Sequence, residues 1–268
     1  MAARANWSWT NGYGSASLAR VHWLAIIGIG AVVGFLGGLF GKGGAAIATP
    51  LLAAVGVPPI VAVASPLPAT VPGTLVAYRR YRRLGIGEPD VIRTTILVGV
   101  PATVAGALAT RWVGGDVLVT ATEAVVMLIG LRLVLWPAPT EVVREDLGHL
   151  TARTVAVAAI VGALAGLLAN AGGFLLVPLY LAVLKLPIKT SLACSLAVAS
   201  VLAVPGTIVH AALGHIDWTV TLVFGLASIP FSGYGARVAL RLRAARLERI
   251  YGGGLAVLGF VLVAGSLT

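Results

Sequence analysis

The sequence predicts an all-α polytopic membrane protein made of two inverted repeats of about five helical segments each. Its composition is 59% hydrophobic and 10% charged, with a mean hydropathy of +0.99, which is too apolar for a water-soluble domain and normal for helices in lipid. Apolar segments of near-spanning length recur along the 268 residues. Glycine and proline motifs of the first half also recur in the second half. We therefore expect one membrane domain with two related halves.

The repeat is visible as two groups of residues at nearly constant spacing. The motif Val-Pro-Gly-Thr at 71–74 recurs at 204–207. Residues upstream of this motif recur 128 positions later, and residues downstream of it recur 129 positions later. The matching pairs are Gly34 and Gly162, Gly38 and Gly166, Gly44 and Gly172, Pro50 and Pro178, Pro101 and Pro230, Gly106 and Gly235, and Gly130 and Gly259. This predicts a tail (1–20), a first repeat (21–137), a cytoplasmic linker (138–152) and a second repeat (153–268).

Ten apolar segments are expected, five in each half. They are 22–40, 45–56, 60–78, 91–112 and 117–136, followed by 154–169, 173–184, 190–210, 218–236 and 250–267. The second segment of each half has only about twelve residues, or ~18 Å of helix, against ~30 Å of hydrocarbon. The glycine turn before it should therefore lie inside the membrane, in a short hairpin that is broken or re-entrant. Irregular backbone at that depth must be buried in protein or face a wet cavity.

Basic residues are distributed oppositely in corresponding loops. The loop after 60–78 holds four arginines within 79–83, whereas its counterpart, 211–215, has no fixed charge. The loop after 218–236 is basic, whereas its counterpart, 111–116, is nearly neutral. Basic loops stay in the cytoplasm, so matching loops should lie on opposite faces, which requires an odd number of crossings per half. Diverged loops in a parallel repeat are the alternative. The net charge of +10 then reports topology and not nucleic-acid binding.

Two glycine turns, 41–44 and 170–173, are candidate anion sites. Each precedes a short segment, and the free N–H groups at a helix start favour an anion. The candidate substrate-binding residues are Lys42, Gly43 and Gly44 in the first turn, and Asn170, Gly172 and Gly173 in the second. Close helix packing is the alternative use of the glycines, and Lys42 could instead extend its amine to the cytoplasmic interface.

Three more polar residues are candidates. Ser65 and Ser195 begin the third segment of each half, where their hydroxyls could contact an anion or simply bond their own helix. Glu123 is the one acid deep in an apolar run and is a candidate for proton coupling. An ion pair with Arg132, or a place near the outer interface, is the alternative for Glu123.

The chain resembles the TauE/SafE family of sulfite exporter-type membrane proteins. The resemblance rests on the G-x3-G…G-G…P stretches at Gly34–Pro50 and Gly162–Pro178 and extends from about Val21 to Gly265. It implies export of sulfite or small organosulfonate anions. Departures from the family pattern are Lys42 in the first glycine cluster, Asn170-Ala171 in the second, and Pro66 and Pro68 in the third segment.

The predicted function is a secondary transporter that works by alternating access at a midplane site between the repeats. An anion channel, or a transporter of another small oxyanion or carboxylate, with or without proton coupling, is the alternative. No P-loop, catalytic set or metal-ligand set is recognisable, so neither an enzyme nor a cofactor is expected. We expect a multi-pass protein of the bacterial inner membrane. Its partners would be a small anion and membrane lipids, with no nucleic acid and a homodimer as the candidate assembly.

Overall fold

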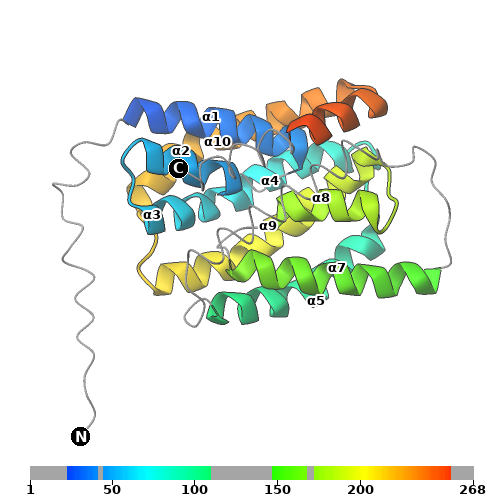
Figure 1. Ribbon diagram of the computed structural model, residues 1–268. Helices are drawn as coiled ribbons and strands as arrows, with labels where there is room; N and C mark the ends of the chain where they lie inside the picture. Colours follow the sequence, from blue (N-terminus) through cyan, green and yellow to red (C-terminus); the bar gives the residue numbers. More distant parts are fainter. Residues whose placement is uncertain (1–22, 42–44, 110–146, 168–171, 255–268) are drawn as a thin grey trace, which may run out of the picture.

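The computed structural model describes residues 23–41, 45–109, 147–167 and 172–254 (Figure 1). These ranges are almost entirely helical and contain no strand, which confirms the predicted all-α class. The first half contributes α1 (Trp23–Phe40), α2 (Ala45–Ala54), α3 (Pro59–Ala64), α4 (Pro66–Arg82) and α5 (Pro89–Ala109). The second half contributes α7 (Leu147–Leu167), α8 (Gly173–Ala182), α9 (Ile188–Ala212) and α10 (Trp218–Arg241), followed by a helical stretch at 244–254.

Five described helices are long and apolar enough to cross a membrane. They are Trp23–Phe40, Ile60–Arg82 (α3 and α4 taken together), Pro89–Ala109, Ile188–Ala212 and Trp218–Arg241. By contrast, α2 and α8 have 10 residues each, or ~15 Å of helix, so neither spans a bilayer alone. The predicted segments 117–136 and most of 250–267 lie outside the described residues.

Small residues hold together two helix pairs, α1 with α10 and α5 with α7, and α4 and α9 lie between the pairs (Figure 1). A Cβ atom on Gly34 or Gly38 of α1 would collide with the α10 backbone at Ser228 or Ser232, respectively. A Cβ atom on Gly166 of α7 would likewise collide with the α5 backbone. These helices therefore touch backbone to backbone, which only glycine permits. Close packing explains why the G-x3-G motif occurs in both halves.

The order of these contacts gives the direction of each helix. Successive glycines of α1 face successive turns of α10, so α1 and α10 run parallel. The pairs are Gly30 with Phe224, Gly34 with Ser228, and Gly38 with Ser232. In the other pair, Gly162 faces Gly99 and Gly166 faces Thr103, so α5 and α7 also run parallel.

The central helices join the two pairs in opposite directions. Helix α4 runs parallel to α10, because Gly225 faces Ala69 and Gly233 faces Val76. It runs antiparallel to α9, because Gly206 near the end of α9 faces Leu67 near the start of α4. Helix α9 runs parallel to α5. As a result, α1, α4 and α10 point one way, and α5, α7 and α9 point the other way.

Two matching hydrogen bonds fix which residues of the halves are equivalent. The amide of Asp217 donates to Ser65 Oγ over 3.0 Å, and the amide of Glu88 donates to Cys194 Sγ over 3.3 Å. The two donors, Glu88 and Asp217, are 129 positions apart, and so are the two acceptors, Ser65 and Cys194. The Val-Pro-Gly-Thr motifs are 133 positions apart, so they lie four residues, about one helical turn, out of register.

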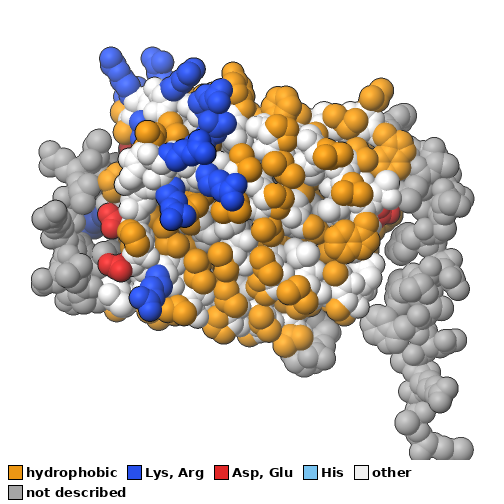
Figure 2. Space-filling model, turned by 180° about the vertical axis from the view of Figure 1, so that it is seen from behind, with side chains coloured by type: hydrophobic (Ala, Val, Ile, Leu, Met, Phe, Trp, Pro, Cys, Tyr) orange, Lys and Arg blue, Asp and Glu red, His pale blue; other side chains and the backbone are white. Residues whose placement is uncertain are grey.

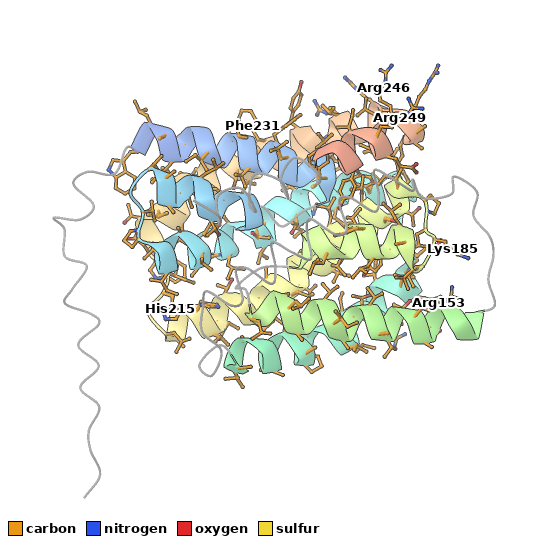
Figure 3. All side chains as sticks on the ribbon, in the orientation of Figure 1. Arg153, Lys185, His215, Phe231, Arg246 and Arg249 are labelled. Atoms are coloured by element: carbon orange, nitrogen blue, oxygen red, sulfur yellow. The ribbon has the colours of Figure 1, made fainter. Side chains whose placement is uncertain are left out.

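Lysine and arginine side chains gather at one end of the molecule, next to a broad apolar surface (Figure 2). Arg153, Lys185, Arg246 and Arg249 lie at this basic end, and His215 lies at the opposite end (Figure 3). Exposed apolar side chains cover the length between the ends, such as Leu24 (84% exposed), Leu97 (65%) and Leu226 (76%). A surface of this kind suits contact with lipid chains.

Candidate functional site

One buried hydroxyl joins the two glycine turns. Ser195 lies on α9 with no exposed surface. Its Oγ atom donates to the carbonyl oxygens of Gly41 (2.8 Å) and Gly173 (3.0 Å), between which its single hydrogen is shared. Gly41 follows α1 in the first half, and Gly173 begins α8 in the second half. We call Gly41, Gly172, Gly173 and Ser195 the glycine junction.

Glycine is required in both turns of the junction for two reasons. Gly41 has φ +68° and Gly172 has φ +69°, a left-handed conformation that side chains disfavour. Space is also short, because a Cβ on Gly41 would lie 2.8 Å from Leu192 Cδ2, and one on Gly172 would lie 2.8 Å from Val161 Cγ1. No residue larger than glycine fits these two tight turns without strain.

The junction lies inside the membrane domain. Ser195 is seven residues after Ile188, the first residue of α9, which places it ~10 Å from the basic end of that helix. The side chains that meet the two turns are apolar, from Val161, Val177 and Leu192. Helix α8 starts at Gly173, and the carbonyl of Gly172 accepts from the amides of Leu175 and Leu176. The positive end of the α8 dipole therefore points into a low-dielectric place, where an anion gains most from it.

The structure places only part of the predicted site. Gly173 and Ser195 touch, and Gly172 is the adjoining residue. Lys42, Gly43, Gly44, Asn170 and Glu123 lie outside the described residues.

Ser65 does not join the junction. Its Oγ accepts from the Asp217 amide (3.0 Å) and its carbonyl accepts from Thr221 Oγ1 (2.8 Å), so it ties the start of α4 to the start of α10. This end of α4 is opposite to its arginine-rich end. Because Ser65 is equivalent to Cys194, the position equivalent to Ser195 is Pro66, and the first half has no hydroxyl there.

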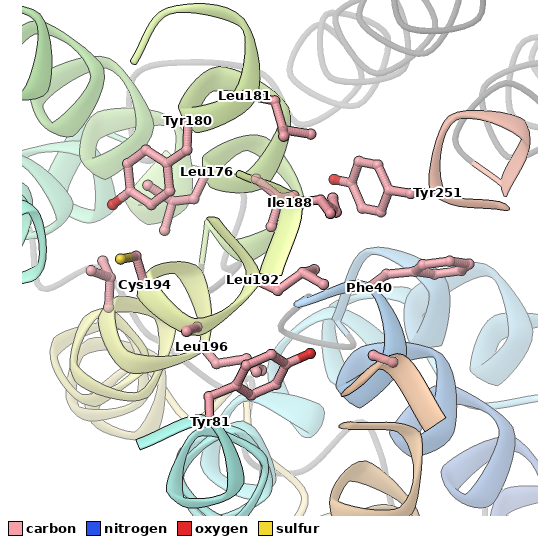
Figure 4. Close-up of a cluster of buried hydrophobic side chains, with 14 of the residues drawn as sticks. Phe40, Tyr81, Leu176, Tyr180, Leu181, Ile188, Leu192, Cys194, Leu196 and Tyr251 are labelled. Carbon is pink, nitrogen blue, oxygen red and sulfur yellow. The ribbon is translucent and has the colours of Figure 1, made fainter. Parts of the chain in front are cut away.

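Buried aromatic residues pack next to the first turn. Phe40, the last residue of α1, meets the ring of Tyr251 edge-on, with centroids 5.6 Å apart (Figure 4). The hydroxyls of Tyr251 and Tyr81 are buried, and neither has a hydrogen-bond partner within the described part of the chain. Two phenol donors are therefore unused in the core that supports Gly41.

A small cavity lined by hydroxyls was missed by the sequence analysis. It measures about 20 Å³, which is room for one water molecule, and lies between α1, α4 and α10. Thr70 and Thr74 of α4 and Ser228 and Ser232 of α10 line it. Each of these hydroxyls donates to a backbone carbonyl, so only oxygen lone pairs remain for a guest. The four-residue spacing within each helix was the available signal.

Two histidines meet at the end opposite to the arginines. The Nδ1 atoms of His210 and His215 are 3.1 Å apart, a distance that suits a hydrogen bond. One of these two nitrogens then carries the proton and the other accepts it. Burial lowers the pKa of His215 below its ordinary value of 6.5.

We expect thermal stability to fall as the pH drops below about 6.5. A histidine with a depressed pKa in the folded protein binds protons more readily after unfolding, so its contribution is present above 6.5 and lost in acid. The melting temperature measured from pH 8 to pH 5 should decline less steeply in His215→Asn than in the wild type. An equal slope in both proteins would contradict this account of the pair.

Known proteins give the following matches. The family model described as sulfite exporter TauE/SafE matches residues 26–262. A protein of Xylella fastidiosa strain 9a5c named "Probable membrane transporter protein" is 28% identical over 238 residues, covering 85% of this chain and 90% of its own length. Its counterpart of the same name from strain Temecula1 is 27% identical with the same coverage. No solved structure matches.

Proposed function

Because the chain belongs to the TauE/SafE sulfite exporter family, we propose that it exports a small anion, sulfite or an organosulfonate, across the bacterial inner membrane. The chain is a multi-pass membrane transporter and not an enzyme. The observation that carries the proposal is the glycine junction, where one serine hydroxyl holds turns from both halves of the chain.

The junction suits an anion because it brings the start of α8 together with glycines from both halves of the chain. Helix α8 begins at Gly173, and α2 begins at Ala45 after the first turn. The N–H groups at a helix start attract negative charge, and glycine lets the backbone approach a ligand closely. The substrate would bind against these turns, with Lys42 and Asn170 as further contacts. The hydroxyl of Ser195 would position the turns, because its proton is already used by their carbonyls.

We propose that the two halves are inverted repeats and that alternating access moves helix pairs against each other. The opposed directions of α1 and α7 and the matching contacts of the two pairs support this proposal. Each glycine-bound pair, α1–α10 or α5–α7, contains one helix from each half. The moving bodies would therefore be these mixed pairs, with the glycine junction between them, and not the sequence halves.

The membrane potential supplies a driving force for export. An inside-negative potential favours anion exit by ~2.3 kcal/mol per charge per 100 mV, so export needs no coupling ion. Uptake of an anion would work against this potential and would need a coupling ion. For that direction we propose proton coupling through Glu123. An anion channel, or a carrier of another oxyanion or carboxylate, is the second candidate, since the junction selects for charge and not for one chemical group.

We expect Ser195→Ala to lower sulfite transport about tenfold in proteoliposomes while the protein still folds. The substitution leaves two turn carbonyls without their donor, a change of about 1–2 kcal/mol in how the turns are held. Ser200→Ala is the matched control, because that hydroxyl donates only to Ala197 in its own helix (2.6 Å). Equal transport by Ser195→Ala and Ser200→Ala would show that the glycine junction has no role in transport.

The same vesicles separate a carrier from a channel and test the substrate. A carrier should saturate with sulfite and should exchange labelled for unlabelled anion. Flux that rises linearly with concentration and shows no exchange would favour a channel. Organosulfonates, sulfate and carboxylates added as competitors give the order of preference.

A further inference from the structure

Arg80 lies across a glycine of the neighbouring helix. A Cβ on Gly233 of α10 would lie 3.5 Å from both Nε and Nη2 of Arg80, so the guanidinium rests on bare α10 backbone. The Nε atom is enclosed and has no hydrogen-bond partner among the residues that the structure describes. An enclosed donor of a charged group without an acceptor destabilises the folded protein, and an anion bound against it would relieve that cost.

The charged neighbours of Arg80 have the same sign as Arg80 itself. Arg237 and Arg83 lie close enough to repel its charge, and no carboxylate of the described residues acts on it. Arg237 is four residues after Gly233, so it stands one turn further along the same face of α10. Two neighbouring guanidiniums that no carboxylate of the described residues neutralises form a place where an anion is stabilised by both.

This arginine pair lies next to the hydroxyl-lined cavity. Ser232, which lines the cavity and donates to the carbonyl of Gly73 (2.9 Å), directly precedes Gly233. The interface between α4 and α10 therefore has hydroxyls in its interior and arginines at its basic end. Figure 2 shows the basic side chains gathered at one end of the surface.

We propose that Arg80 and Arg237 form an oxyanion-binding site at the basic end of α4 and α10. Its ligand is a negatively charged group with at least two oxygens that share the charge, either a free oxyanion such as sulfite or the phosphate of a lipid with a net negative charge. The planar guanidinium fork matches such oxygens in pairs. Gly233 is part of the site, because it makes room for Arg80. The proposal stands without the proposed function, since it concerns binding at a place distinct from the glycine junction.

The test is a binding measurement on purified full-length protein in neutral detergent. Sulfite, with chloride at equal ionic strength as the reference, should raise the melting temperature of the wild type in a saturable way. Arg80→Gln and Arg237→Gln should each raise the half-saturating sulfite concentration about tenfold, the loss of one charged hydrogen-bonded contact. Arg246→Gln is the control, because it removes the same charge from an exposed position of 244–254.

Gly233→Leu provides an independent variant. It keeps every charge but displaces the Arg80 guanidinium, so it should weaken sulfite binding as strongly as Arg80→Gln. Equal binding by the wild type, Arg80→Gln and Gly233→Leu would overturn the proposal. Loss of binding in Arg246→Gln of the same size would also overturn it, because the basic end would then act only as diffuse charge.

The source of the oxyanion is decided in nanodiscs. Nanodiscs of phosphatidylcholine alone and nanodiscs containing phosphatidylglycerol are compared for the same variants. Sulfite stabilisation that depends on Arg80 in phosphatidylcholine supports a free anion. Stabilisation that depends on Arg80 only with phosphatidylglycerol supports a headgroup. No dependence on Arg80 in either nanodisc refutes the site. That result leaves the proposed function standing, because transport by Ser195→Ala tests it separately.

Discussion

Gly166→Leu should leave little folded protein. A side chain on Gly166 would collide with the backbone of α5 at Thr103, and its first carbon would lie 2.6 Å from the amide nitrogen of Ala107. Backbone atoms in two packed helices cannot rotate away as a side chain can, so α5 and α7 must separate. Overpacking with side-chain relief costs about 1–3 kcal/mol, and this collision lacks that relief. The loss approaches the whole stability of a domain, which is about 5–15 kcal/mol.

The measurement is the yield of monodisperse protein on size-exclusion chromatography, together with its melting temperature. Gly38→Leu should fail in the same way, because Gly38 meets the α10 backbone at Ser232. Gly28→Leu is the control, since Gly28 is on α1 and has no atom within 4 Å of an added Cβ. A monodisperse Gly166→Leu with the wild-type melting temperature would disprove the backbone contact between α5 and α7.

Gly172→Ala has the second largest expected effect and acts on the glycine junction. Alanine at φ +69° costs about 1–2 kcal/mol in backbone energy alone. Its Cβ would also lie 2.8 Å from Val161 Cγ1, which adds an overpacking cost of about 1–3 kcal/mol. We expect a lower melting temperature and a loss of transport at temperatures where the wild type is active, because the start of α8 moves.

Gly214→Ala separates the two costs. Gly214 has φ +71° but no atom within 4 Å of an added Cβ, so it carries the backbone cost alone. The double variant Gly172→Ala with Val161→Ala should regain part of the stability lost by Gly172→Ala, because it restores the space. If Gly214→Ala destabilises the protein as much as Gly172→Ala, crowding at the junction is not important.

Much of the fold could be predicted from local patterns. The short segment predicted at 45–56 is α2 (Ala45–Ala54), and the one at 173–184 is α8 (Gly173–Ala182). Both were visible because a glycine turn and a proline bracket a short apolar run. The segment predicted at 60–78 is two helices, α3 and α4, that meet at Ser65. Pro66 was the signal for that break, because proline favours the first position of a helix.

The partners of these elements could not be predicted from local patterns. The spacing of the glycines in α1 carries no sign of their partner, and their contacts are on α10 in the second half. Ser65 and Ser195 were both candidates because each lies near the start of a third segment. They are not equivalent positions, since the hydrogen bond from Glu88 to Cys194 makes Cys194 the counterpart of Ser65. A shift of one residue turns a helix side chain by 100°, which decides whether it reaches the junction.

The exchange of partners between the halves bears on how such a chain could arise and assemble. Neither α1 nor α7 finds its backbone-contacting neighbour within its own half, so a ribosome must finish the second copy before the first can close. Under the inverted repeat that we propose, a single ancestral copy would have met the same need by associating with an oppositely inserted twin. Fusion of the two copies into one polypeptide would fix their stoichiometry at one to one and would let each copy diverge. Ser195, with Pro66 at the matching position of the first half, would be one such divergence.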